Sequence, residues 1–407
     1  MSEIDVPPGT TFGERLRRYR ERAGMSRPVL GGLVGRSDGW VKALESGRLL
    51  TPRLPMLIQL AQILGVAELS DLTGDDKVSL ASYVKSAHEA LPTVAAALTA
   101  YRLDDADDSA VTADQLAALV QQAWDLWHGA RNQRTAIATV LPGLIDQARA
   151  TARVLDGVDR RRALAGLAQV YHLAQLYLSF QPRQELVYLT GDRAMLAAQD
   201  ADDPAAVAGA AWYVNHVYRD AGERHDARLQ LAGEAARLLR PEDDPEHLAR
   251  WGLLQLAIAL SFAKTGREGD AWRYWDEADR AAAALGPGYV HPWLIFGTGM
   301  VRAYAVTMNA DLMRGGEAIR SADQLNLDAM PSATRRSFHM VETARAYSLR
   351  REPVATVALL RRAHEASPDT IRFNLFAQAA IPDLAQNGGA TVRQDAADLA
   401  AKLGISA

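Results

Sequence analysis

The sequence contains no cysteine, and this absence excludes several kinds of protein site at once. Without a thiol there is no disulfide framework, no thiolate metal site and no cysteine nucleophile. Long hydrophobic runs are also missing, since no stretch approaches the roughly eighteen apolar residues of a membrane span. The first residues, MSEIDVPPGTT, are polar and lack the apolar segment of a signal peptide. We therefore expect a cytoplasmic protein that does not enter a membrane.

Constellations of residues that perform chemistry are scarce too. The nine histidines form neither a His-x-x-x-His pair with a glutamate nor another cluster of metal ligands. The sequence also lacks a nucleophile elbow. The glycine pairs Gly286-x-Gly288 and Gly297-x-Gly299 lack the preceding strand and the following pattern of a phosphate-binding loop. The sequence thus predicts no enzyme, no cofactor and no metal.

Strand-like segments are the third absence. No alternating run of Val, Ile and Thr stands out, whereas Ala, Leu, Arg, Glu and Asp dominate the composition. At 407 residues the chain is long enough for two or three domains. We expect an all-α protein with almost no sheet.

What is present, first of all, is a series of short amphipathic helices between residues 12 and 72. They are separated by residues that favour helix ends and helix starts, namely Gly24, Ser26, Gly35, Ser37 and Gly47. The second and third helices are each about eight residues long and are joined by a tight turn. Such a unit is a helix-turn-helix, whose second helix is free to enter the major groove of DNA.

The charge distribution supports this interpretation. Residues 11–65 contain ten basic and four acidic side chains, so the segment carries about +6 while the whole chain carries −4. A cationic module on an otherwise acidic protein is typical of a phosphate-binding domain.

The third helix, DGWVKALES, separates into two faces. Val41 and Leu44 are expected to pack inward on Leu16, Leu30 and Leu33, and Trp40 is expected to pack rather than to wedge between bases. The opposite face and the flanking arginines are left for bases and phosphates. The predicted DNA-binding residues are Arg27, Arg36, Ser37, Asp38, Gly39, Lys42, Ala43, Arg48 and Arg53.

These motifs resemble the DNA-binding domain of the XRE (Cro/lambda-repressor-like) family. The resemblance rests on G-x-R-L-R at 13–17, G-M-S at 24–26, G-x-S at 35–37, V-x-x-x-E-x-G-x-x-x-x-P at 41–52 and L-x-x-L-A-x-x-L-G-V at 57–66. It implies a buried structural role for Glu45 and a homodimer that binds a palindromic operator in double-stranded DNA. The chain departs from the family at Arg27, where glutamine is usual. Because Asp38, Gly39 and Ala43 offer few donors, base recognition would depend on Lys42, Arg36 and DNA shape.

The second informative feature is a repeat in the rest of the chain. A small or amide residue followed three positions later by an aromatic or apolar residue recurs at 174, 215, 259, 303 and 344. Units of about 40 residues cannot bury their apolar faces alone, so neighbours must stack into a solenoid. The unit with Ala259, Phe262, Gly266, Ala271 and Trp275 resembles a tetratricopeptide (TPR) repeat.

The TPR resemblance implies a concave surface formed by the first helix of each pair. The predicted ligand-binding residues on it are Tyr171, Gln175, Trp212, His216, Arg219, Met300, Tyr304 and Arg345. Such a surface suits a peptide or a small molecule with an anionic end. The alternative is that some apolar members of this surface are simply core between helices.

These features predict three regions and one function. Residues 10–73 are expected to form the helix-turn-helix domain, 74–110 linker helices with an acidic loop, and 111–407 a TPR-like domain for ligand sensing and dimerisation. The hypothesis is a sequence-specific transcriptional regulator, similar to bacterial XRE–TPR regulators, that responds to a peptide or small-molecule effector. The alternative is a protein-interaction scaffold in which the helix-turn-helix serves as a DNA tether.

Overall fold

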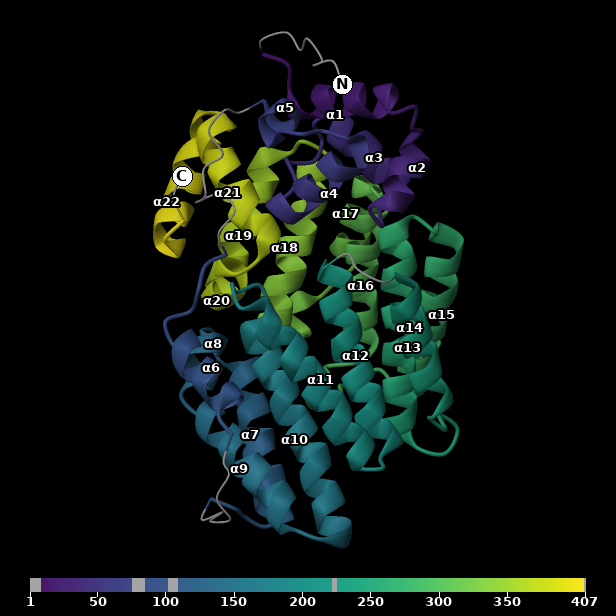
Figure 1. The fold of residues 1–407 in the computed structure, drawn as a ribbon, viewed down its shortest axis with the longest axis vertical. Coiled ribbons are helices and arrows are strands. Elements are labelled where there is room, and N and C mark those ends of the chain that lie inside the picture. Colours follow the sequence, from purple (N-terminus) through teal and green to yellow (C-terminus); the bar gives the residue numbers. More distant parts are fainter. Residues whose placement is uncertain (1–8, 75–84, 102–108, 222–224, 406–407) are drawn as a thin grey trace.

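The computed structural model describes residues 9–74, 85–101, 109–221 and 225–405, with the side chains of 217–221 left out, and every regular element in these ranges is a helix (Figure 1). The chain begins with five short helices at one end of the molecule. They are α1 (Phe12–Arg22), α2 (Arg27–Leu33), α3 (Asp38–Glu45), α4 (Leu54–Leu64) and α5 (Leu69–Thr73). The expected all-α fold with an N-terminal helix-turn-helix is confirmed.

Local chemistry accounts for the ends of these helices. Thr11 and Glu14 form a reciprocal capping box at the start of α1. The Ser26 hydroxyl accepts from the Val29 N–H at the start of α2, and the Ser37 hydroxyl accepts from the Trp40 N–H at the start of α3. The chain then leaves α1, α2 and α3 through left-handed glycines, at Gly24, Gly35 and Gly47.

The core of this domain follows the predicted inward faces with one exception. Val41 and Leu44 of α3 are buried with Leu16 and Leu30, as expected. Leu33, however, is 52% exposed, and its place inside is taken by Val34, which is fully buried. The reason is that α2 ends at Leu33, so the turn directs the next side chain inward.

The segment after the helix-turn-helix contains α6 (Leu91–Thr99). Leu91, Val94 and Leu98 bury their side chains in the main core, where α6 packs against α9 and α11. This helix is therefore attached to the repeat domain. The predicted acidic loop at 104–109 lies, except for Ser109, outside the described residues.

The remaining helices form a stack of antiparallel pairs. They are α7 (Ala113–Gly129), α8 (Gln133–Ala138), α9 (Leu141–Val154), α10 (Gly157–Leu178), α11 (Gln184–Asp200), α12 (Pro204–Ala221), α13 (His225–Arg237), α14 (Pro245–Thr265), α15 (Glu268–Ala284), α16 (Thr298–Asp311), α17 (Gly315–Asp323), the short 3-10 helix η2 (Leu327–Ala329), α18 (Ala333–Leu349), α19 (Pro353–Ala366), α20 (Pro368–Arg372), α21 (Leu375–Asn387) and α22 (Ala390–Leu403).

Successive pairs stack through their first helices. Within each pair, from α10 with α11 through α18 with α19, the two helices pack on one another. The first helix of each pair also contacts the first helix of the next pair; these first helices are α10, α12, α14, α16 and α18. The turns inside several pairs contain one left-handed residue: Phe180, Gly266, Met313 and Arg351. This is the predicted TPR-like solenoid.

The stack curves back on itself, and its interior is filled. Helix α7 contacts both α10 and the much later α18. Trp124 of α7 stacks on Trp293 of the α15–α16 connection, with 5.3 Å between ring centroids. Tyr213 of α12 stacks in turn on His172 of α10 at 4.5 Å. These rings are buried, so α7 and the α15–α16 connection occupy the concave side.

A second contact closes the stack near α8. The carboxylate of Asp369, in α20, accepts from the backbone N–H of Arg134, and the Arg134 guanidinium donates to the Asp369 carbonyl. The same guanidinium lies 4.6 Å from the Phe373 ring centroid. Burial lowers the pKa of Arg134 to about 10, which leaves it charged at neutral pH. A buried cation with several acceptors thus joins the first and last parts of the repeat domain.

Buried histidines make the fold sensitive to acid. Burial lowers the pKa of His172 and His339 to about 3 and that of His128 to about 4. Below pH 6.5 the unfolded chain binds protons that the folded chain excludes, so stability is complete above pH 6.5 and falls as the pH decreases. We expect each of these histidines to cost about 2 kcal/mol at pH 5, as measured by denaturant unfolding at pH 7 and pH 5.

The matched variant for this prediction is His339→Leu. Neither ring nitrogen of His339 has a hydrogen-bond partner among the described residues, so the change removes a titrating group without breaking a bond. The loss of stability between pH 7 and pH 5 should become smaller by about 2 kcal/mol. An unchanged pH dependence in this variant would contradict the assignment.

Candidate nucleic-acid interface

Helix α3 is held close to its neighbours by two glycines. A Cβ atom on Gly13 would lie 2.5 Å from the Leu44 carbonyl oxygen, and one on Gly31 would lie 2.8 Å from the Arg36 carbonyl oxygen. Both positions therefore require glycine for α1 and α2 to approach α3 and the turn before it. The result is a tightly fixed α2–turn–α3 unit.

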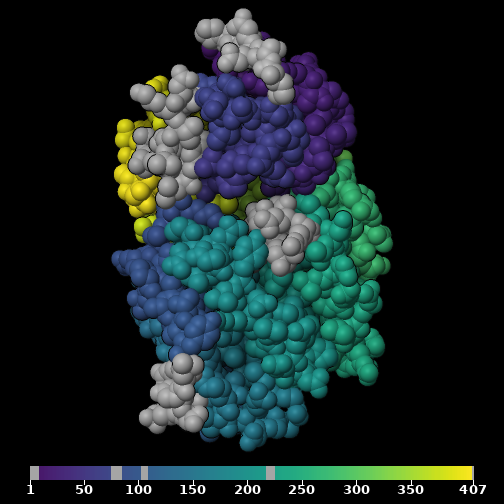
Figure 2. All heavy atoms as spheres, viewed as in Figure 1, coloured from purple at the N-terminus to yellow at the C-terminus, as the bar shows by residue number. Residues whose placement is uncertain are grey.

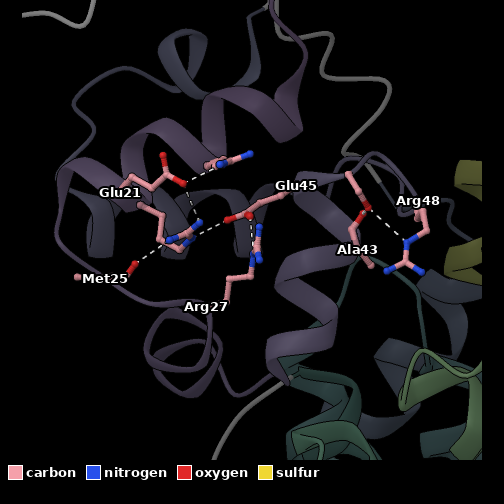
Figure 3. Close-up of polar contacts among 9 residues, drawn as sticks. Glu21, Met25, Arg27, Ala43, Glu45 and Arg48 are labelled. Carbon is pink, nitrogen blue, oxygen red and sulfur yellow. Dashed lines mark hydrogen bonds and ion pairs between the residues drawn. The ribbon is translucent and has the colours of Figure 1, made fainter.

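A buried carboxylate ties the three helices together (Figure 3). Glu45 at the end of α3 accepts from Arg20 Nε of α1 at 2.5 Å and from Arg27 Nε of α2 at 2.7 Å. Arg20 also donates to the carbonyl of Met25 at 2.8 Å. The Glu45 side chain is only 2% exposed, so both charges are needed to compensate its burial. Glu45 is structural, as the family resemblance implied.

The outward side of α3 is only partly open. Asp38 and Lys42 are exposed, as expected. Gly39 is half-buried and Ala43 is fully buried, although Ala43 belongs to no cluster of the helix-turn-helix core. The prediction that Ala43 is exposed is therefore wrong in this arrangement. Gly39, one helical turn before Ala43, lies against Met313 of the α16–α17 turn, so the repeat domain covers part of this side of α3.

The flanking arginines already have partners in the protein. Arg27 is bonded to Glu45, and the Arg48 Nε donates to the Ser46 hydroxyl. Arg53 donates to the Gln378 side chain of α21 at 2.7 Å, and burial lowers its pKa. The Arg36 guanidinium lies 5.7 Å from the Trp40 ring centroid. Arg53 is directed towards the repeat domain rather than outward.

Four repeat-domain residues lie against α3 and the segments that flank it, and they were not predicted from the sequence. Gly266, Met313, Arg351 and Gln378 contact the helix-turn-helix at or beside the turns of the helix pairs. No sequence signal identifies them, because each is more than 200 positions from its partner. Gly266, Met313 and Arg351 lie in the turns of three successive pairs and Gln378 lies in α21, a placement that is visible only after the stack is built.

The predicted ligand-binding residues lie on the first helices, as expected, but they do not form an open groove. Tyr171, Gln175, Trp212, Met300 and Tyr304 are at most 5% exposed. The expectation of an accessible concave surface is therefore wrong for this structure. The reason is that α7 and the α15–α16 connection fill the concave side.

The charged members of that set differ in their surroundings. His216 is half-buried and meets the Trp212 ring edge-on at 4.5 Å. Arg345 is paired with Asp311 at 2.7 Å and with Glu342 at 3.3 Å, so its charge is already compensated. Arg219 lies in α12, and its side chain is outside the described residues.

Two further observations concern the described part of the chain. It contains no group of three or more His, Asp or Glu side chains arranged to hold a metal ion. None of its helices is long and apolar enough to cross a membrane.

Fold and site together define an all-α protein in which an XRE-like helix-turn-helix precedes a TPR-like stack. Residues 11–73 match the model of the family described as "Helix-turn-helix domain", so this segment is a helix-turn-helix domain. No curated protein is significantly similar to the chain.

Two solved structures share low similarity with the chain. A Rap protein complexed with Competence and Sporulation Factor is 11% identical, with 89% of this chain and 99% of that chain covered and a TM-score of 0.41. BtubC from P. vanneervenii is 14% identical, with 56% of this chain and 88% of that chain covered and a TM-score of 0.37.

The Glu45 clamp gives a direct test of the site's architecture. Replacing Glu45 by Ala removes the buried carboxylate that compensates the charge of Arg20, so the helix-turn-helix should lose about 3 kcal/mol of stability. Hydrogen exchange of the amides of α1 to α3 measures this loss. The control is Arg17→Ala, which removes only an exposed pair with Glu21 and should leave exchange unchanged. Equal exchange in both variants would contradict the clamp.

Proposed function

We propose that the protein is a sequence-specific DNA-binding transcriptional regulator whose TPR-like domain responds to a peptide or small-molecule effector. The observation that carries this proposal is the helix-turn-helix itself, capped and packed as described and carrying about +6 on an acidic chain. Cationic charge supplies affinity for phosphates, and a fixed second helix supplies sequence recognition.

Base recognition is assigned to the exposed side of α3. Lys42 and Asp38 are the exposed groups, and Arg36 lies just before the helix. Besides these groups the exposed side of α3 offers few donors, so recognition would depend on Lys42, Arg36 and DNA shape rather than on several bidentate hydrogen bonds. Arg27 and Arg48 remain the candidates for phosphates.

The acting species is proposed to be a homodimer that binds a palindromic operator. One α3 helix contacts only a few base pairs, so a two-fold pair with half-sites about 34 Å apart supplies the affinity that one copy lacks.

The effector is proposed to act inside the repeat stack. Several polar atoms on its inner helices are buried without a hydrogen-bond partner among the described residues: Gln175 Oε1, Trp212 Nε1, Thr307 Oγ1 and both ring nitrogens of His339. A buried polar atom left unpaired costs about 1–3 kcal/mol. A peptide carries both donors and acceptors along its backbone, so it matches this mixture when α7 or the α15–α16 connection moves aside.

The DNA-binding proposal is tested by selecting bound duplexes from a random-sequence library. We expect an enriched motif with two-fold symmetry. Lys42→Ala and Arg36→Ala should each weaken binding to the enriched duplex about tenfold, or about 1.4 kcal/mol, while weak binding to random DNA at low salt persists. The control is Arg162→Ala, an exposed arginine at the far end of the stack.

Failure to enrich any motif, with random DNA still bound, would contradict sequence-specific regulation. That outcome would favour the alternative of a scaffold that uses the helix-turn-helix as a DNA tether.

The effector proposal is tested with Thr307→Val. The Thr307 hydroxyl has no partner among the described residues, so the isosteric change should leave thermal stability equal or slightly higher. A peptide library and a metabolite library are screened by thermal shift on the unmodified protein. A compound that raises the melting temperature of the unmodified protein should raise the melting temperature of the Thr307→Val variant less. An identical response would remove this hydroxyl from the effector site, and no response to either library would contradict the effector proposal.

A further inference from the structure

Part of the side of α3 that faces away from its own domain core lies against the repeat stack, whereas Asp38 and Lys42 on that side are exposed. Gly39 and Ala43 lie four residues apart, so they share one face of α3, and Ser46 follows as the C-cap. In Figure 1 the helix-turn-helix sits over the upper ends of α16, α17 and α18, and in Figure 2 its purple atoms meet the green atoms of the stack. The surface that receives it, here called the turn platform, consists of Gly266, Met313, Arg351 and Gln378.

Contacts at the start of α3 are the closest. A Cβ atom on Gly266 would lie 2.5 Å from the Cβ of Ser37, so the N-cap of α3 rests directly on the α14–α15 turn. A Cβ atom on Gly39 would lie 3.6 Å from Met313 Cγ and 3.8 Å from Met313 Cβ, in the α16–α17 turn. The first turn of α3 therefore touches the turns of two successive pairs.

The end of α3 and the segment after it extend the same contact. Arg351, in the α18–α19 turn, donates to the Ser46 carbonyl at 3.0 Å. Arg53 donates to the Gln378 side chain. Leu49 packs with the apolar cluster of Val306 and Leu349. The contact thus involves the start of α3, its C-cap and the segment after it.

Sterics make this contact incompatible with DNA. A helix with its side chains is about 10–12 Å across, and the major groove of B-DNA is about 12 Å wide. An inserted α3 fills the groove and leaves no room for another element against its first turn. The turns carrying Gly266 and Met313 therefore occupy space that the walls of the groove require.

The contact also has the character of a reversible one. It includes hydrogen bonds through long arginine side chains, which water can replace. Beside it lies an open hollow of about 520 Å³ between the α2–α3 turn and the start of α13, lined by Gly32, Gly35, Arg36, His225, Asp226 and Thr265, so water reaches this edge of the contact.

We propose that the turn platform is an intramolecular competitor of DNA, which holds α3 in a docked position that must be released before the helix enters a major groove. The inference rests on the proposed function and adds its mode of control. If the docked form is favoured by a given factor, the apparent affinity for DNA is lower by about the same factor. Any partner or effector that binds the undocked form better raises the affinity for DNA.

The absence of cysteine makes a clean test available. The distance of 3.8 Å between the added Cβ of Gly39 and that of Met313 matches a disulfide, for which Cβ atoms lie about 3.5–4.5 Å apart. The full-length double variant Gly39→Cys, Met313→Cys is oxidised, and closure of the disulfide is verified by mass. Binding to random-sequence duplex at low salt, and to any enriched duplex, is then measured before and after addition of reductant.

We expect the oxidised form to bind at least tenfold more weakly than the reduced form. The single variant Gly39→Cys is the control, and its binding should not respond to oxidant. Equal binding by the oxidised and reduced double variant would overturn the competitor proposal while leaving the proposed function intact. If neither the unmodified protein nor any variant, in the oxidised or the reduced form, binds DNA, both the proposed function and the competitor proposal are overturned.

A second pair of variants leaves the helix-turn-helix sequence intact. Met313→Ala removes the side chain that touches the first turn of α3, and Arg351→Ala removes the bond to Ser46. Each should strengthen DNA binding several-fold, and the amides of α3 should exchange faster. The matched control is Arg320→Ala in α17, whose exposed arginine pairs with Glu317. Unchanged affinity in both platform variants would contradict the proposal.

Discussion

The contact between Ser37 and Gly266 determines where the DNA-binding domain sits. Ser37 is the N-cap of α3, and Gly266 is the left-handed residue that ends α14, so each has a local role in its own domain. Together they allow two backbones to approach so closely that any side chain at Gly266 would collide with Ser37. The helix-turn-helix is thereby placed with the start of α3 against the stack, while Asp38 and Lys42 stay exposed.

Two kinds of buried polar group have different consequences in this molecule. Glu45 is matched by two arginines, and Arg134 by several acceptors, so these groups fix the positions of helices. By contrast, Trp212 and His339 bury polar atoms that find no partner among the described residues. Buried groups with partners stabilise one arrangement of the helices. Buried groups without partners destabilise the present arrangement relative to one in which a ligand pairs with them. The matched groups thus lie in the helix-turn-helix and at the closure of the stack, and the unmatched ones lie on its inner helices.

Features that depend on neighbours in sequence were predictable from the residues alone. Serine caps, left-handed glycines and the spacing of Leu16, Leu30 and Val41 identify the helix-turn-helix, because each feature is set within one or two helical turns. The interval of about 40 residues likewise indicates stacked pairs, since every unit must bury the same face against the next. Leu33 marks the limit of such prediction. It was expected to be buried, but α2 ends there and the next residue, Val34, is buried instead.

The sequence by itself therefore determined the class of fold, the reading helix and the repeating stack, because local periodicity and capping chemistry encode them. Tertiary structure alone decided that Ala43 is covered and that Tyr171 and Trp212 lie in a closed interior. The contact at the start of α3 comes from turns more than 200 positions away, and the closed interior comes from α7 and the α15–α16 connection. The amino-acid pattern of a helix shows which face is apolar or small, and only the assembled chain decides whether that face meets water, a ligand or another part of the same protein.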